Sequence, residues 1–199
     1  MMQWSWIGAC FVLVACAVAW GSRRVRRRAR TCQETLALMK PQLPLEVARV
    51  HGFPSPALDG RHCGYAIHLT CEPTAETTTW KLHTELHDDW SGRLLLQCDQ
   101  RPGRMREWYG AEIHLTGDST FDRAVTVATT DDSLARRVLQ PYFRERLRPL
   151  ANAHLQIEVD RRGVFAELTT THQSGHEQLV ATLAVFTTLC GLIDVALAT

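Results

Sequence analysis

Residues 79–87 read T-W-K-L-H-T-E-L-H, and this stretch decides the fold class. Apolar and polar side chains alternate along it, as they do in a β-strand with one buried face and one wet face. The predicted core-facing side chains are Trp80, Leu82, Thr84 and Leu86, and the predicted solvent-facing ones are Thr79, Lys81, His83, Glu85 and His87. We therefore expect a sheet that has one solvated face.

The same alternation recurs on both sides of this strand. Residues 65–71 form a predicted strand upstream, and residues 155–168 form a predicted hairpin that turns at Arg161-Arg162-Gly163. Two more strands, 94–98 and 108–115, flank Arg101-Pro102-Gly103-Arg104, and Pro-Gly suits the centre of a type II turn, which predicts a second hairpin. Residues 52–64 are predicted to be an irregular loop, since Gly and Pro occupy four of their first nine positions.

Helix signals come late in the chain. Asp131 or Asp132 supplies an N-cap for a helix over 134–139, and Pro141 suits the first position of another over 141–147. Ser174 and Glu177 have the spacing of a capping box and open a final helix through about Ala196. The predicted fold class is α+β, with an antiparallel meander and hairpin sheet packed against two or three helices.

The amino terminus has the composition of a membrane segment. Residues 4–20 carry no charge, and with residues 1–3 they make twenty residues, or about 30 Å of helix. Trp4, Trp6 and Trp20 stand where aromatic rings prefer the headgroup region. We therefore expect a single transmembrane helix over 1–22, a basic juxtamembrane stalk over 23–43 and one α+β domain over 44–199.

Six arginines and no acid follow this apolar run. They are the candidate membrane-surface residues Arg23, Arg24, Arg26, Arg27, Arg28 and Arg30. By the positive-inside rule they predict an inner-membrane protein with its carboxyl-terminal domain in the cytosol. Two alternatives stay open. Leu13-Val14-Ala15-Cys16 is similar to the lipobox of a lipoprotein, although no basic residue precedes the apolar run as in a secretory signal. Residues 179–198 are long enough for a second membrane span, although a helix laid across the sheet is favoured.

Composition limits the partners. The 199 residues are 45% hydrophobic, so the chain folds, and the arginine run leaves 16 bases against 21 acids elsewhere. A body with a net charge near −5 argues against a nucleic-acid partner, because such proteins need a basic face. The seven cysteines include no C-x-x-C pair, which indicates free thiols rather than a disulfide framework or a zinc site.

Several polar groups are candidates for functional sites, but their spacing favours ordinary surface or turn residues. They are the pairs His83/His87 and His172/His176, the cluster His62, Cys63, His68 and Cys71, and the carboxylates Asp88 and Asp89. On a strand, His83 and His87 lie about 13 Å apart, too far for one zinc ion. We therefore expect no metal, no cofactor and no catalytic residue.

Nucleotide-binding, hydrolase and metalloprotease motifs are absent from the sequence. The predicted function is a protein-interaction, tethering or assembly module at the membrane, with an unidentified protein partner and no enzymatic activity. The alternative is a membrane-anchored enzyme or small-ligand-binding domain that uses the Cys/His-rich region 62–71.

The stretch G-D-S-T-F-D-R-A-V-T-V, residues 117–127, followed by an Ala/Leu/Arg helix that ends at Arg146-Leu147, resembles a family of bacterial membrane-tethered domains of unknown function. The resemblance implies an α+β fold and membrane tethering, and it implies no catalytic residue. From their residue types alone, Phe121 is expected to be buried in the core, and Asp122 is expected to be a turn or cap residue.

Overall fold

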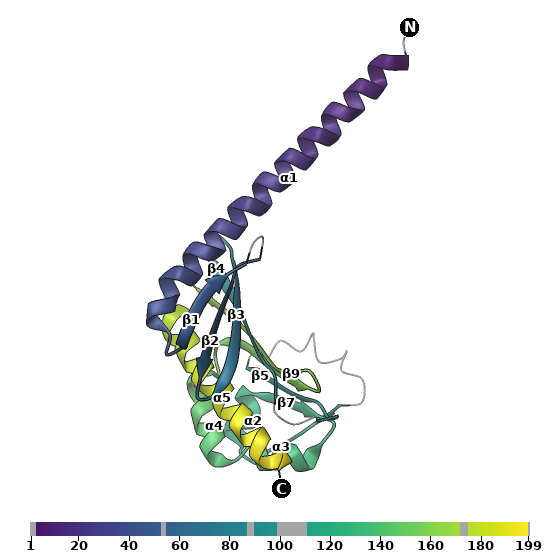
Figure 1. Ribbon diagram of the computed structural model, residues 1–199. Helices are drawn as coiled ribbons and strands as arrows, with labels where there is room; N and C mark the ends of the chain where they lie inside the picture. Colours follow the sequence, from purple (N-terminus) through teal and green to yellow (C-terminus); the bar gives the residue numbers. More distant parts are fainter. Residues whose placement is uncertain (1–2, 53–54, 87–89, 99–110, 172–174, 199) are drawn as a thin grey trace.

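The computed structural model describes residues 3–52, 55–86, 90–98, 111–171 and 175–198, with side chains from residue 20 onward. Within these residues the strands form one nine-stranded sheet in which all neighbours are antiparallel, in the order β1-β2-β3-β4-β9-β8-β5-β7-β6 (Figure 1). The strands are β1 (Glu46–His51), β2 (Ala57–His62), β3 (Tyr65–Pro73), β4 (Thr77–Thr84), β5 (Leu94–Cys98), β6 (Glu112–Ile113), β7 (Thr126–Thr129), β8 (His154–Asp160) and β9 (Gly163–Thr171).

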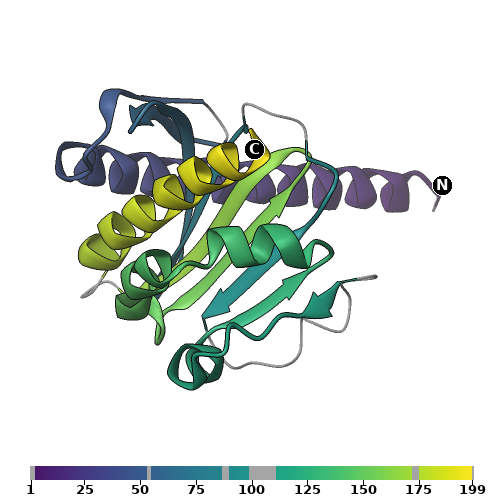
Figure 2. The same cartoon turned by 90° about the horizontal axis from the view of Figure 1, so that it is seen from below.

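Five α-helices complete the described fold, and Figure 2 shows α4 and α5 crossing one face of the sheet. They are α1 (Gln3–Met39), α2 (Ser119–Ala124), α3 (Asp132–Val138), α4 (Pro141–Leu147) and α5 (Gly175–Leu197), with short 3₁₀ turns at Lys40–Gln42 and Arg148–Leu150. Asp131 caps α3 by accepting the N–H of Leu134, and Pro141 opens α4, as the sequence predicted.

The core lies between the helices and one face of the sheet. On β4 the side chains of Trp80, Leu82 and Thr84 are buried, as the alternation predicts. The apolar face continues across the neighbouring strands, because paired residues lie on the same face. Trp80 pairs with Leu168, and Leu82 pairs with both Leu69 and Ala166. The opposite face has no helix on it among the described residues and carries the polar half of each alternating strand. We call it the open face.

The carboxyl-terminal part of α1 belongs to this core. Ala29, Cys32 and Leu36 are buried, and Cys32 and Leu36 belong to the same apolar cluster as the sheet. The Cys32 thiol also donates to the carbonyl oxygen of Cys71 on β3 at 3.0 Å. These positions recur at three- and four-residue spacing, which places them on one side of the helix. The helix is therefore attached to the sheet from Ala29 onward.

The predicted fold class needs correction in the sheet. Residues 94–98 and 108–115 do not form a hairpin: β5 pairs with β7 and β8, and β7 separates it from β6. Residues 57–62 were predicted to be loop but form β2, which pairs with both β1 and β3. The predicted turn at 101–104 lies outside the described residues. The hairpin over 155–168 is confirmed, because β8 and β9 pair from His154↔Thr169 to Asp160↔Gly163.

The placement of the membrane helix is a second correction. The sequence predicted a transmembrane helix over 1–22 that was distinct from the stalk, whereas one continuous helix, α1, runs from Gln3 to Met39 and includes all six arginines. Among the residues with described side chains, the helix that is long and apolar enough to cross a membrane is α5, at the other end of the chain. The amino-terminal placement is therefore wrong.

Helix α5 combines this composition with a place in the core. Its apolar stretch is 56% buried inside the domain. The buried residues include the face predicted from the sequence, namely Leu179, Leu183, Phe186, Cys190 and Ile193. Because these side chains pack on the sheet and on α3 and α4, the helix forms the central part of the helical layer.

Candidate functional site

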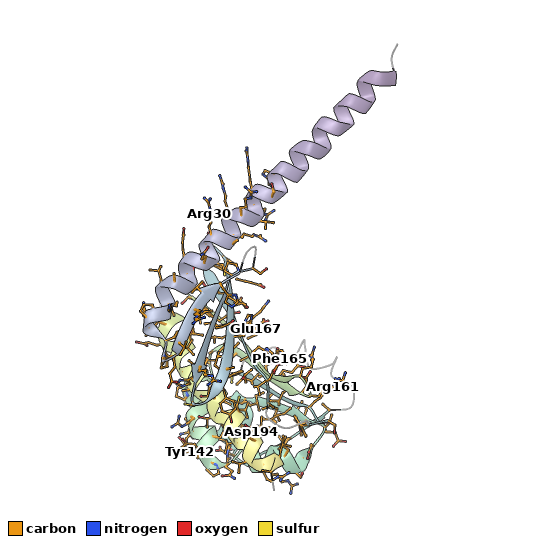
Figure 3. All side chains as sticks on the ribbon, in the orientation of Figure 1. Arg30, Tyr142, Arg161, Phe165, Glu167 and Asp194 are labelled. Atoms are coloured by element: carbon orange, nitrogen blue, oxygen red, sulfur yellow. The ribbon has the colours of Figure 1, made fainter. Side chains whose placement is uncertain are left out.

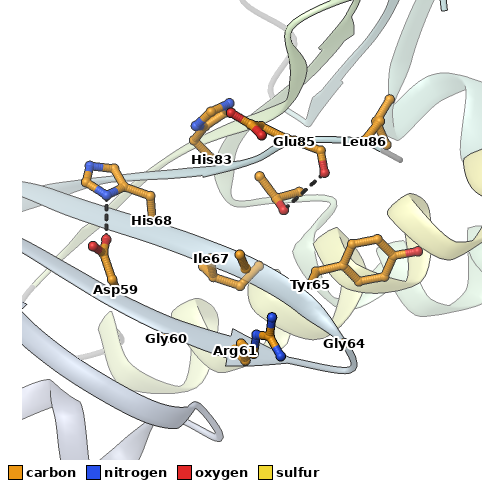
Figure 4. Close-up of a pocket in the computed structure, with 12 residues that line it drawn as sticks. Asp59, Gly60, Arg61, Gly64, Tyr65, Ile67, His68, His83, Glu85 and Leu86 are labelled. Atoms are coloured by element: carbon orange, nitrogen blue, oxygen red, sulfur yellow. Dashed lines mark hydrogen bonds and ion pairs between the residues drawn. The ribbon is translucent and has the colours of Figure 1, made fainter. Parts of the chain in front are cut away.

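The sheet divides between β3 and β4. These strands pair from Pro73↔Thr78 to His68↔His83, and there their pairing ends. Beyond that point β3 continues beside β2 as far as Tyr65, while β4 stays beside β9. The division leaves a cavity of about 550 Å³, shown in Figure 4. We call this cavity the fork; it is lined by Asp59, Gly60, Arg61, Gly64–His68 and His83–Leu86.

A carboxylate held by two histidines lies at the open-face side of the fork. Asp59 Oδ1 lies 2.6 Å from His68 Nδ1, and its Oδ2 contacts His51 Nε2. Partial burial acts to raise the pKa of Asp59, but the bonds from His51 and His68 outweigh that effect, so the pKa of Asp59 lies below its ordinary value. All three side chains are about half exposed, so this group meets solvent.

His83 continues this polar surface onto the next strands. Its ring stacks on Phe165 of β9 with ring centres 4.4 Å apart, and the Arg162 guanidinium lies 5.2 Å from the centre of the Phe165 ring. A second hollow of about 300 Å³ lies over β4, β9 and β8, and it shares His68 and His83 with the fork. Figure 3 shows Phe165 and Glu167 together on β9. The fork and this hollow therefore adjoin each other at His68 and His83.

The core-facing side of the fork is apolar. Ile67 is buried, and Tyr65 and Leu86 are partly buried and pack against the core. The Tyr65 hydroxyl donates to Asp194 Oδ2 of α5 at 2.7 Å. Burial, followed by this bond and the Asp194 charge, raises the pKa of Tyr65, so its phenol stays protonated. The fork therefore has a charged rim and an apolar floor that contacts α5.

The six arginines predicted at a membrane surface all lie on α1 and are all exposed. At about 100° per residue they spread over roughly 200° of the helix. The opposite side carries Ala29, Cys32 and Leu36, which pack on the sheet. Figure 3 shows Arg30 where the helix reaches the domain. Packing of the buried side therefore turns the basic side away from the sheet.

The other polar groups predicted from the sequence as candidates do not form one site. The His62 ring contacts the carbonyl oxygen of Pro44, Cys63 is exposed in the β2–β3 turn, His68 lies on the open face, and Cys71 lies on the core face. His176 contacts the carbonyl oxygen of Gln42. His87, Asp88, Asp89, His172 and Ser174 lie outside the described residues.

Within the described part of the chain, no group of three or more His, Cys, Asp or Glu side chains is arranged to hold a metal ion. His51 and His68 are both bonded to Asp59, which orients their rings as a carboxylate orients a general base. Among the described residues, no serine or cysteine side chain bonds to either ring.

The short motif residues occupy ordinary structural roles. Phe121 is buried, as expected, and Asp122 accepts hydrogen bonds from the backbone N–H groups of Thr116 and Gly117 and from the Thr116 hydroxyl. Both lie in α2, and Asp118 caps that helix. Asp122 therefore fixes the segment that precedes α2, and α2 leads into β7.

Two groups of side chains that meet in the structure were not predicted from the sequence. His51 and Asp59 were missed because β1 and β2 carry no clear alternation, and no local signal links them to His68. The Cys32 and Cys71 sulfur atoms lie 3.0 Å apart in the core between α1 and β3. These cysteines are 39 positions apart, and only the docking of α1 on the sheet brings them together.

Comparisons with known proteins identify no family for this chain. No protein-family model matches the chain, and no curated protein does. A solved structure that resembles it is the crystal structure of the mycobacterial trehalose monomycolate transport factor A, with a TM-score of 0.46 and 14% identity, covering 87% of this chain and 96% of that one.

Proposed function

We propose that this chain is a membrane-associated accessory protein, in which the arginines of α1 lie against anionic phospholipid and the nine-stranded domain binds another protein. The observation that carries the proposal is the position of the six arginines. They are all exposed, they lie on the side of α1 that faces away from the sheet, and no acid occurs between residues 23 and 33.

Electrostatics favours this arrangement over nucleic-acid binding. Each arginine near an anionic membrane surface contributes about 1 kcal/mol of attraction. Residues 31–199 carry more acids than bases, so anionic lipid repels the rest of the chain. Attraction at one end and repulsion at the other fix which side of the molecule meets the membrane. Because anionic lipid is concentrated in the cytoplasmic leaflet, the proposal places the domain on the cytosolic side.

The open face supports the protein-binding half of the proposal. It presents the fork and the adjoining hollow, which are lined by charged, imidazole and apolar side chains. Concave surfaces with a few convergent polar groups are where proteins bind partners and ligands. The arrangement gives an accessory protein one surface for lipid and another for its partner.

The test measures binding of the full-length chain to phosphatidylcholine vesicles with and without phosphatidylglycerol. Changing all six arginines to glutamine is expected to lower binding to the anionic vesicles by at least about tenfold, because the summed attraction is several kcal/mol. Changing all six to lysine keeps the charge and is expected to preserve binding. Arg146→Gln with Arg161→Gln removes two exposed charges from the domain and serves as the positional control. Equal binding by the glutamine variant and the native chain would refute the proposal.

A further inference from the structure

Two cysteines from different elements meet where α1 lies on the sheet. Cys32 is on α1 and Cys71 is on β3, and their sulfur atoms lie 3.0 Å apart. That distance is within about 1 Å of the length of a sulfur–sulfur bond. Both thiols are free and buried in this structure. A small movement of either side chain is therefore enough to join them.

We propose that Cys32 and Cys71 form a reversible disulfide that locks α1 onto the sheet. The oxidant is a low-molecular-weight disulfide of the glutathione class, and a dithiol regenerates the two free thiols. This inference concerns the contact between α1 and β3. It goes beyond the proposed binding of lipid and protein and does not rest on it.

The bond would lie in the middle of the attached surface of α1. Ala29 and Leu36, about one turn of helix to either side of Cys32, are buried, as Cys32 is. The two cysteines are 39 positions apart, and the chain between them forms β1 and β2. A bond that closes such a loop restricts the unfolded chain and so stabilises the folded one. The same bond keeps the buried side of α1 on β3 when local opening would otherwise release it.

A cavity of about 420 Å³ gives access to the pair. Cys32 and Cys71 both line it, beside the exposed side chains of Arg28 and Glu72. The volume lies within the usual range of small-ligand sites. A molecule of the size of glutathione can therefore reach the sulfur atoms while the domain stays folded.

The reaction consists of two thiol–disulfide exchanges. In the first, the Cys32 sulfur attacks one sulfur of oxidised glutathione, the S–S bond breaks, and one glutathione leaves with the Cys32 proton. In the second, the Cys71 sulfur attacks the Cys32 sulfur of the mixed disulfide, and the other glutathione leaves with the Cys71 proton. The pair thus loses two electrons and two protons, and oxidised glutathione gains them. Burial, followed by the hydrogen bond with Cys32, raises the pKa of the Cys71 thiol, so Cys71 keeps its proton until the second step.

The experiment equilibrates the full-length chain in mild detergent with oxidised and reduced glutathione, alkylates the remaining thiols in urea and maps the peptides without reduction. We expect a crosslinked pair of peptides that contains Cys32 and Cys71, lighter by two hydrogens than the separate peptides and lost on treatment with dithiothreitol. Cys98 and Cys190 are also buried, and they are expected to be recovered in alkylated form.

A second sample is equilibrated with the same mixture at the midpoint of urea unfolding. Opening of the domain exposes the sulfur atoms there, so slow access through the cavity does not hide the bond. The pair Cys32–Cys71 is again expected to predominate, because folding brings these two sulfurs together. Absence of this pair from both samples, or a larger yield of any other pair, would overturn the proposal.

Hydrogen exchange tests whether the bond locks the helix. The amides of residues 29–36 are expected to exchange at least about tenfold more slowly in the oxidised chain than in the reduced chain, because the attached segment no longer opens alone. Cys71→Ser cannot form the bond, so its exchange should be the same in both buffers. Cys63→Ser removes an exposed thiol and should leave the slowing unchanged. A crosslinked chain whose exchange over 29–36 equals that of the reduced chain would refute the lock.

Discussion

Leu36→Ala tests whether α1 is attached to the sheet as described. Leu36 is 0% exposed and lies in the core between α1 and the strands. The substitution removes three carbon groups at about 0.8 kcal/mol each, a transfer loss of about 2.4 kcal/mol. The cavity left behind raises the expected loss of unfolding free energy to about 3 to 5 kcal/mol.

Leu38→Ala is the matched control, because it makes the same change two residues further along the same helix. Leu38 is 70% exposed, so its truncation should cost less than about 0.5 kcal/mol. Helix propensity changes equally in both variants and cancels in the comparison. The difference between the two therefore measures burial.

The assay is urea unfolding of the full-length chain in a mild detergent, followed by tryptophan fluorescence. Trp80 and Trp90 are both buried, so their emission changes when the domain opens. A lower midpoint with unchanged slope for Leu36→Ala, and a midpoint near that of the native chain for Leu38→Ala, is the expected result. Equal losses in the two variants, or a loss below about 1 kcal/mol for Leu36→Ala, would refute the docking of α1.

Three further predictions concern other parts of the domain. Treatment with diamide, which takes up two electrons and two protons, should join Cys32 and Cys71 in a disulfide, because their sulfurs lie 3.0 Å apart; a non-reducing peptide map checks this, with Cys32→Ser as control. Burial and the nearby Asp160 raise the pKa of Glu158 above 4.5, so the native chain loses stability as pH rises through that pKa; Glu158→Gln should raise the urea midpoint at about pH 7 and leave it unchanged at about pH 4. Asp118→Ala removes the N-cap of α2 and should lower the urea midpoint in the same unfolding assay, whereas Asp118→Asn keeps a capping oxygen and should leave the midpoint near that of the native chain.

Local patterns predicted the elements whose signals are local. The alternation along β4, β8 and β9 survives because those strands have one buried and one solvated face, and α3 and α4 begin where Asp131 and Pro141 indicate. Strand β2 was missed because its glycine was interpreted as a loop residue. A Cβ at Gly60 would lie 3.0 Å from the Cβ of Leu45, so that glycine permits a close approach inside a strand.

Strand order and the candidate site depend on contacts that no local pattern records. The chain inserts β7 between β5 and β6, although β5 and β6 are consecutive along the described sequence. His51, Asp59 and His68 meet because β1, β2 and β3 lie side by side, and the fork exists because β3 and β4 part after His68 and His83. The arginines could be predicted from the sequence because they form a run of charge. The fork could not, because it depends on where the pairing of β3 and β4 ends.

Because α1 is continuous, its basic segment and the sheet are expected to move as one rigid body. Its 37 residues form a rod of about 55 Å, and the described backbone has no break between Arg23 and the residues that pack on the sheet. A rod without a hinge transmits rotation, so tilting the basic segment by some angle tilts the whole sheet by the same angle. The orientation of the fork relative to a bound membrane surface is then fixed by the fold. Two glycines inserted between Arg28 and Ala29, just before the attached segment, would create a hinge. The fluorescence anisotropy of a dye on Cys63 of the vesicle-bound chain would then fall, because the domain would rotate faster than the helix.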